Sequence, residues 1–127
     1  MGSYLLRLSW PAKALWQNRP THWAARAKAK RTARREATAE ALLRGLPSMP
    51  GAELSFEFHP PDNRKRDLHN MPATQKAAID GIADAMRCDD AGFKVVWPTE
   101  WGQVVPNGAV SITINGHQEP NPKETIE

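Results

Sequence analysis

Cysteine is almost absent from this sequence, which has one, Cys88, among 127 residues. A single cysteine excludes an intramolecular disulfide and a zinc site built from cysteines, and it is typical of a reducing compartment. The sequence also lacks an apolar run long enough for a signal peptide or a membrane-spanning helix. We therefore expect a soluble cytoplasmic protein with no membrane partner.

Acidic residues are missing from the first 35 positions. The same positions hold nine cations: Arg7, Lys13, Arg19, Arg26, Lys28, Lys30, Arg31, Arg34 and Arg35. The net charge of +3 understates this asymmetry, because acids gather later in the chain. A basic half favours a polyanionic partner, and a solvated helix face is the alternative. We expect nucleic acid as the partner.

One domain is expected, since 127 residues are enough for one hydrophobic core but not for two. Segments 3–10, 52–59, 93–97 and 109–115 have strand-like patterns, most clearly where apolar and polar residues alternate. An Asn107-Gly108 turn precedes the last of them, so we predict that the last two strands form a hairpin. We assign residues 1–116 to the domain and 117–127 to a mobile, acidic, proline-containing tail.

Two segments favour helix. Thr21 is the predicted N-cap of a long alanine-rich helix that ends near Arg44, before Gly45. Pro72 suits the first turn of a second helix, which has an apolar stripe at helical spacing and ends near Cys88. The chain is thus predicted to contain about four strands and two main helices.

Cations form two neighbouring rows on the first predicted helix. A helical wheel places Arg26, Lys30 and Arg34 in one row and Lys28, Arg31 and Arg35 in the other. Adjacent rows of cations without acids repel each other unless an anion lies nearby. We therefore predict phosphate contacts by this helix, chiefly through Arg26, Lys30, Arg31 and Arg34.

The loop before this helix offers further contacts with DNA. Lys13 and Arg19 provide charge, and Trp16 or Trp23 is available to stack on a base. Packing is the more common role of tryptophan, so the sequence leaves both roles open.

A basic loop, residues 60–76, lies between the second strand and the second helix. Its charged residues are four cations and two acids: Arg64, Lys65, Arg66, Lys76, Asp62 and Asp67. Cations can hold the backbone of a nucleic acid, and a carboxylate can hold a divalent metal that activates water against phosphorus. We predict that the protein acts on phosphates at this loop.

The same region resembles the RusA family of Holliday junction resolvases, which are common in phages and prophages. The family pattern is a basic run leading into Asp-Leu-Asp-Asn, then a Gln-Lys-Ala-Ala helix and an Asp-Asp pair. Here these elements read Asn63-Arg64-Lys65-Arg66-Asp67-Leu68-His69-Asn70, Gln75-Lys76-Ala77-Ala78 and Asp89-Asp90. Trp10-Pro11 and Pro61-Asp62 also match the family's pattern. The likeness covers most of the chain and is strongest over residues 56–90.

The resemblance implies a small α+β fold, with a mixed sheet packed against two helices, that works as a homodimer. It also implies cleavage of four-way DNA junctions by two symmetric nicks, in recombination and repair, with Mg²⁺ or Mn²⁺ and no small-molecule cofactor. A phage or prophage protein of this kind would act in the cytoplasm of a bacterial host. Arg64, Lys65 and Arg66 would position the DNA arms.

By position, Asp67 and Asp90 match two metal-binding acids of the family, and Lys76 matches its functional lysine. Asp89 is the neighbour of the second matched acid. Acids at the two ends of one helix are far apart along it. Asp90 must therefore meet Asp67 across a dimer interface or through a folded-back turn, and the sequence leaves both routes open.

His69 stands where the family has its middle aspartate. A neutral imidazole suits Mn²⁺ better than Mg²⁺, which prefers oxygen ligands. His69 is then a metal ligand, a general base on the attacking water, a mark of altered activity, or a residue bonded to nearby backbone. Two alternatives to the resolvase follow: a branched-DNA-binding relative with reduced or lost cleavage, and a nuclease for flap or fork DNA.

Overall fold

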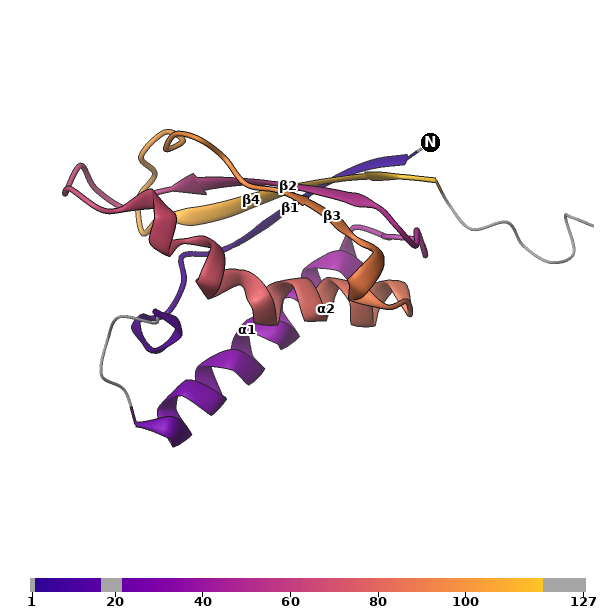
Figure 1. The fold of residues 1–127 in the computed structure, drawn as a ribbon, viewed down its shortest axis with the longest axis horizontal. Helices are drawn as coiled ribbons and strands as arrows, with labels where there is room; N and C mark the ends of the chain where they lie inside the picture. The colour runs from indigo at the N-terminus through magenta and orange to yellow at the C-terminus, as the bar shows by residue number, and fades with distance from the viewer. Residues whose placement is uncertain (1, 17–21, 118–127) are drawn as a thin grey trace, which may run out of the picture.

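The computed structural model describes residues 2–16 and 22–117, and Figure 1 shows a sheet with its helices packed on one face. The strands are β1 (Gly2–Ser9), β2 (Glu53–His59), β3 (Lys94–Val96) and β4 (Ala109–Gly116). The two main helices are α1 (Trp23–Leu43) and α2 (Lys76–Met86). Four short 3₁₀ turns join them: η1 (Lys13–Leu15), η2 (Leu68–Asn70), η3 (Pro72–Gln75) and η4 (Asp90–Gly92).

The sheet is mixed, with strand order β1-β4-β2-β3. β4 runs antiparallel to both β1 and β2, whereas β3 runs parallel to β2. A parallel neighbour needs a crossover connection, and α2 supplies it between β2 and β3. The predicted α+β fold, with four strands and two main helices, is confirmed.

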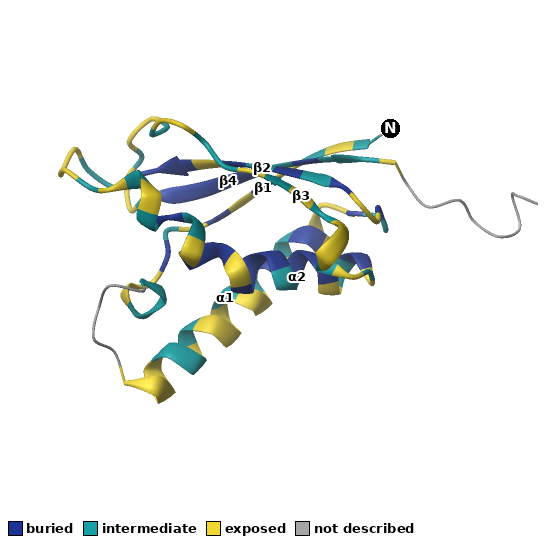
Figure 2. Cartoon of the chain, viewed as in Figure 1, coloured by how far each residue is buried: buried dark blue, intermediate teal, exposed yellow. Residues whose placement is uncertain are grey.

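The core lies between the sheet and the helices. Alternate residues of each long strand point to this side, so that Leu6, Ile112 and Phe56 form one row across three strands. All three are buried, and Figure 2 shows buried residues along the strands of the sheet and along α2 beneath it. The alternation of apolar and polar residues in the sequence therefore predicted correctly which face of each long strand is buried.

α1 and α2 approach each other closely. A Cβ atom on Gly81 of α2 would overlap the backbone carbonyl oxygen of Arg34 in α1. The hydroxyl oxygen of Thr38 lies 2.9 Å from the carbonyl oxygens of both Arg34 and Gly81. Ala37 and Ala41 are fully buried on the same side of α1. The C-terminal half of α1 is therefore the part that packs closely on α2.

The predicted hairpin between the last two strands is wrong. β3 pairs only with β2, and β4 inserts between β1 and β2. The Asn107-Gly108 turn does form, with positive φ at both residues, but it leads into a central strand. The physical reason is burial: even Ser111, on the face of β4 away from the helices, is only 9% exposed.

Two helix boundaries also differ from expectation. His22 is the N-cap of α1, where its Nδ1 accepts a hydrogen bond from the backbone N–H of Ala24; Thr21 lies outside the described residues. Pro72 begins the 3₁₀ turn η3, and α2 starts only at Lys76, because Gln75 (φ −105°, ψ −1°) interrupts the helical path. The predicted tail, apart from His117, lies outside the described residues. Among the described helices, none is long and apolar enough to cross a membrane.

Candidate functional site

Lys76, the first residue of α2, lies between two carboxylates. Its Nζ is 2.9 Å from Oδ1 of Asp80, one helical turn later, and 2.7 Å from Oδ2 of Asp90. α2 ends at Met86, its C-cap Arg87 adopts a left-handed conformation (φ 57°), and η4 then turns the chain back. This folded-back turn brings Asp90 to the side chain of Lys76 within one chain.

In this triad (Lys76, Asp80 and Asp90) the ammonium is stabilised by both carboxylates. The hydrogen bond from Lys76 lowers the pKa of Asp90 below its usual value. Hydrogen bonds to Asp90 and then Asp80 raise the pKa of Lys76. Asp90 is therefore a carboxylate and Lys76 an ammonium at neutral pH, which is the charge state that binding of cations and phosphates requires.

Arg34 joins α1 to α2 next to this triad. Its guanidinium forms a bidentate ion pair with the Asp84 carboxylate of α2: Nε lies 2.6 Å from Oδ2, and Nη2 lies 2.9 Å from Oδ1. The hydrogen bond from Arg34 lowers the pKa of Asp84, and Asp80 and Asp90 add to the positive shift in the pKa of Arg34. Arg34 therefore links α1 to α2 one helical turn beyond Asp80.

A basic cleft of about 410 Å³ lies between α1 and the start of α2. It contains all four of the α1 cations singled out from the sequence together with two members of the triad: Arg26, Lys30, Arg31, Arg34, Lys76 and Asp80. Lys30 and Arg31 are exposed. The predicted phosphate contacts of α1 thus share one cleft with Lys76.

An aromatic groove of about 500 Å³ lies between the segment that follows β1 and the loop after β2. It is lined by Trp10, Pro11, Lys13 and Trp16 and by the loop residues Pro61, Asp62, Arg64, Lys65, Arg66, Asp67 and Asn70. The basic cleft and the aromatic groove share no lining residue. The predicted DNA contacts therefore divide between two hollows, and Arg19 lies outside the described residues.

The basic run has two kinds of cation. The Arg66 side chain is only 15% exposed, and its guanidinium bonds the carbonyl oxygens of Asp62 and Arg64 and the Asp62 carboxylate. Bonds from the backbone N–H of Arg64 and from the Arg66 side chain lower the pKa of Asp62. Arg66 therefore organises the loop, whereas Arg64 and Lys65 are exposed to a ligand.

Asp67 and Asp89 are both N-caps. Oδ1 of Asp67 accepts from the backbone N–H of His69 at 3.0 Å, and Oδ1 of Asp89 accepts from that of Ala91 at 2.9 Å. The exposed ring of His69 stands on the first turn of η2. Within residues 2–16 and 22–117 of one chain, no three His, Cys, Asp or Glu side chains gather closely enough to hold a metal.

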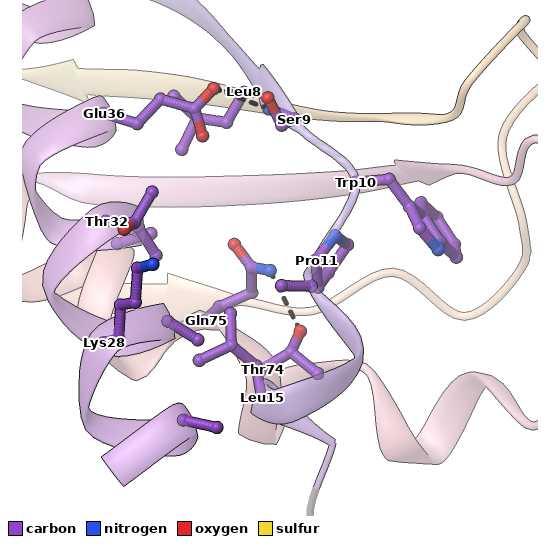
Figure 3. A pocket seen from close by; sticks show the side chains of 15 residues that line it. Leu8, Ser9, Trp10, Pro11, Leu15, Lys28, Thr32, Glu36, Thr74 and Gln75 are labelled. Carbon is purple, nitrogen blue, oxygen red and sulfur yellow. Dashed lines mark hydrogen bonds between the residues drawn. The ribbon is translucent and has the colours of Figure 1, made fainter.

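A third hollow is apolar. About 450 Å³ in volume, it lies between the end of β1, η1, α1 and the start of α2, and alanines line much of it. Figure 3 shows Glu36 reaching Ser9 at one end and the Gln75–Thr74 bond at the other, while the ring of Trp10 turns away. This apolar pocket is separate from the charged residues of the triad.

Sequence reasoning missed Asp80 as a member of the site. The Lys76–Asp80 spacing was recognisable only as a helix-surface ion pair. The Lys76–Asp90 contact makes this pair part of the site, and it joins residues fourteen positions apart across a turn. The Arg34–Asp84 pair spans fifty residues, and no local pattern indicates it.

The fold and site define a small α+β protein with cations and carboxylates collected where two helices cross. No family model matches the sequence. The chain is 40% identical over 116 residues to an uncharacterized protein of Xylella fastidiosa (strain Temecula1), covering 87% of this chain and 75% of that protein. The chain belongs to the same family as this Xylella protein.

Acid should weaken the fold through the Arg34–Asp84 pair. Because the pKa of Asp84 is lowered in the folded state, the pair stabilises the protein above a pH of about 4, the ordinary aspartate value. This stabilisation is lost as the pH falls through the lower folded pKa. In urea unfolding, the midpoint of the wild type should therefore fall more between about pH 5 and pH 2.5 than that of Asp84→Asn.

Glu100→Gln is the matched control, since Glu100 is an exposed acid in the loop between β3 and β4. It should follow the wild-type pH curve. Parallel curves for the wild type and Asp84→Asn would show that the pair adds no pH-dependent stability.

Proposed function

We propose that this protein is a metal-dependent, structure-specific endodeoxyribonuclease that resolves Holliday junctions by paired symmetric nicks. The main observation that supports this proposal is the 2.7 Å contact between Lys76 and Asp90 beside the basic cleft. These are the residues that the resemblance matches to a functional lysine and a metal-binding acid. They lie fourteen positions apart, and their meeting supports a shared role.

In this proposal, different residues bind the DNA phosphate and stabilise the charge that develops on it. Lys30 and Arg31 are exposed on α1 in the basic cleft and hold the backbone by charge. Asp80 and Asp90 fix the direction of the Lys76 ammonium. A cation positioned in advance stabilises negative charge that develops on the phosphoryl oxygens as the bond breaks.

A divalent metal fits the carboxylates of the triad. Asp80 and Asp90 each bond the Lys76 ammonium through one oxygen, so the metal would lie beside the ammonium and use their second oxygens. Mg²⁺ is commonly held by one or two carboxylates, with waters completing its shell. When bound, such an ion would neutralise phosphate charge and lower the pKa of a coordinated water. Asp67, Asp89 and His69 are the further candidates for ligands, and His69 would favour Mn²⁺.

Paired nicks also require two active sites. We therefore propose that the protein works as a homodimer on a four-way junction, in the cytoplasm of a bacterial cell. Asp67 reaches Asp90 in this proposal either within one chain or across the dimer interface.

A second candidate is a relative that binds branched DNA without cutting it. Two observations favour it: His69 replaces an acid, and the described part of one chain gathers no three metal-ligating side chains. The basic cleft and the exposed loop cations serve this function equally well. Binding would weaken steeply with salt in either case.

Cleavage of a labelled four-way junction tests the proposal. The junction and a linear duplex of the same sequence are incubated with Mg²⁺, with Mn²⁺ and with a chelator. We expect paired symmetric nicks in the junction only, and only with metal. Tight junction binding without nicks in either metal would exclude the nuclease and leave the second candidate, and equal cutting of duplex and junction would exclude both. Nicking of flap or fork DNA alone would indicate a nuclease of that specificity.

A further inference from the structure

We propose that the aromatic groove is a subsite for one unpaired nucleotide of branched DNA, with Trp16 stacking on the base. Lys13, Arg64 and Lys65 would hold the flanking phosphates. This subsite rests on the proposed function in taking DNA as the ligand. It shares no lining residue with the cleft that holds Lys76, although Asp67, a candidate metal ligand, lines its edge. Stacking of a base on Trp16 uses neither Asp67 nor Lys76, so it can be measured without cleavage.

The aromatic side of the groove is built around Trp10. Its ring centroid lies 6.2 Å from that of Trp16 and 6.2 Å from that of Trp101. The guanidinium carbon of Arg66 lies 5.7 Å from the same ring, within cation–π range. These neighbours leave Trp10 little freedom, and Trp10 in turn supports Trp16. A ring held in place before binding loses little entropy when a base stacks on it.

The charged side of the groove favours a phosphate. Four cations and two acids are among the lining residues. The Asp62 carboxylate is already bonded to the Arg64 backbone and the Arg66 side chain. The Arg64 side chain is 78% exposed, and Lys65 is exposed beside it. The exposed cations that line the groove therefore outnumber its one exposed acid, Asp67, next to an aromatic surface.

This combination selects a single-stranded segment over a duplex. Base stacking on an aromatic ring needs an open base face, which paired and stacked bases do not offer. Binding grooves that track single strands pair such rings with cations. The volume of about 500 Å³ is typical of a small-ligand pocket, and a duplex is too wide for it. The exchange point of a branched DNA can supply an unstacked nucleotide.

Trp23 is the natural control. The sequence offered Trp16 and Trp23 equally for stacking, but the structure separates them. Trp23 is 76% exposed, stacks against His22 at the start of α1 and lines neither the groove nor the cleft. Trp16 is half-buried and lines the groove.

The test compares wild type, Trp16→Leu, Trp16→Phe and Trp23→Leu. The probes are a short oligo(dT) and a four-way junction with one unpaired 2-aminopurine at the exchange point. Trp16→Leu should weaken oligo(dT) binding by roughly 5- to 100-fold, the loss expected for one base stack, and abolish the fluorescence quenching of 2-aminopurine. Trp16→Phe should restore much of both, and Trp23→Leu should match the wild type.

Circular dichroism of Trp16→Leu excludes a folding defect. Lys65→Gln, an exposed change, separates charge from stacking: it should weaken binding and reduce its salt dependence without altering the quenching. Wild-type oligo(dT) affinity and quenching in a folded Trp16→Leu would overturn the subsite, and the nicking assay would still decide the proposed function. Loss of stacking in Trp16→Leu, with no nicking by wild type, would support the subsite and overturn the nuclease.

Discussion

Asp90→Asn should reduce junction nicking by at least about 10²- to 10³-fold, the effect typical of removing one group that stabilises charge in a transition state. The amide keeps the shape of the side chain but loses the charge that pairs with Lys76 at 2.7 Å. One of the two carboxylates available to a dication is lost at the same time. The Asp90 side chain is 34% exposed, so the fold should tolerate the change. Single-turnover cleavage of a labelled junction measures the effect.

Two further variants sharpen this test. Glu100→Gln removes an exposed carboxylate in the loop between β3 and β4 and should nick like the wild type. Asp80→Asn removes the other carboxylate on Lys76 and should also slow nicking, because it frees the ammonium on one side. Junction affinity should persist in all three, since the cations of α1 remain. An Asp90→Asn variant that nicks at the wild-type rate would remove Asp90 from the proposed site.

Gly81→Ala should lower the free energy of unfolding by about 1–3 kcal/mol, the usual cost of overpacking, although alanine is the better helix former by about 1 kcal/mol. The new methyl group would overlap the backbone carbonyl oxygen of Arg34, which cannot move without shifting α1. The same shift would disturb the contacts of Thr38 and the Arg34–Asp84 pair. Urea unfolding measures the change.

Ala39→Gly provides the scale for this prediction. Ala39 is exposed on α1, so the change reports helix preference without a packing effect and should cost up to about 1 kcal/mol. If preference alone governed position 81, Gly81→Ala would stabilise the protein by a similar amount. A stabilised Gly81→Ala would contradict the close crossing of α1 and α2.

Local pattern predicted the elements and their inner faces well. The alternation in β1, β2 and β4 and the apolar stripe of α2 reflect period two and period 3.6, which depend only on near neighbours. The strand order was not predictable in this way. The Asn107-Gly108 turn has the local geometry of a hairpin turn, and only pairing with distant β1 and β2 decides that β4 lies at the centre.

The candidate site was likewise predictable only in part. The resemblance singled out Lys76 and Asp90, and the helical wheel collected the α1 cations that line one cleft. Asp80 belongs to the site only because it shares Lys76 with Asp90, and Arg34 pairs with Asp84, fifty residues away in sequence. Spacing along one helix is visible in a sequence, whereas a contact between two helices depends on how they cross.

The position of β4 also determines when the chain can fold. β4 is the last strand in the part of the chain that the structure describes, yet it separates β1 from β2, with Gly2 opposite Gly116. Until the ribosome has released the residues of β4, β1 has no neighbour in the sheet and the helices have an incomplete surface to cover. Contacts so distant in sequence slow folding and leave strand edges open while they wait. The sheet is therefore incomplete until β4 has been made, and a nascent chain that stops short of Ala109 should remain a substrate for chaperones and proteases.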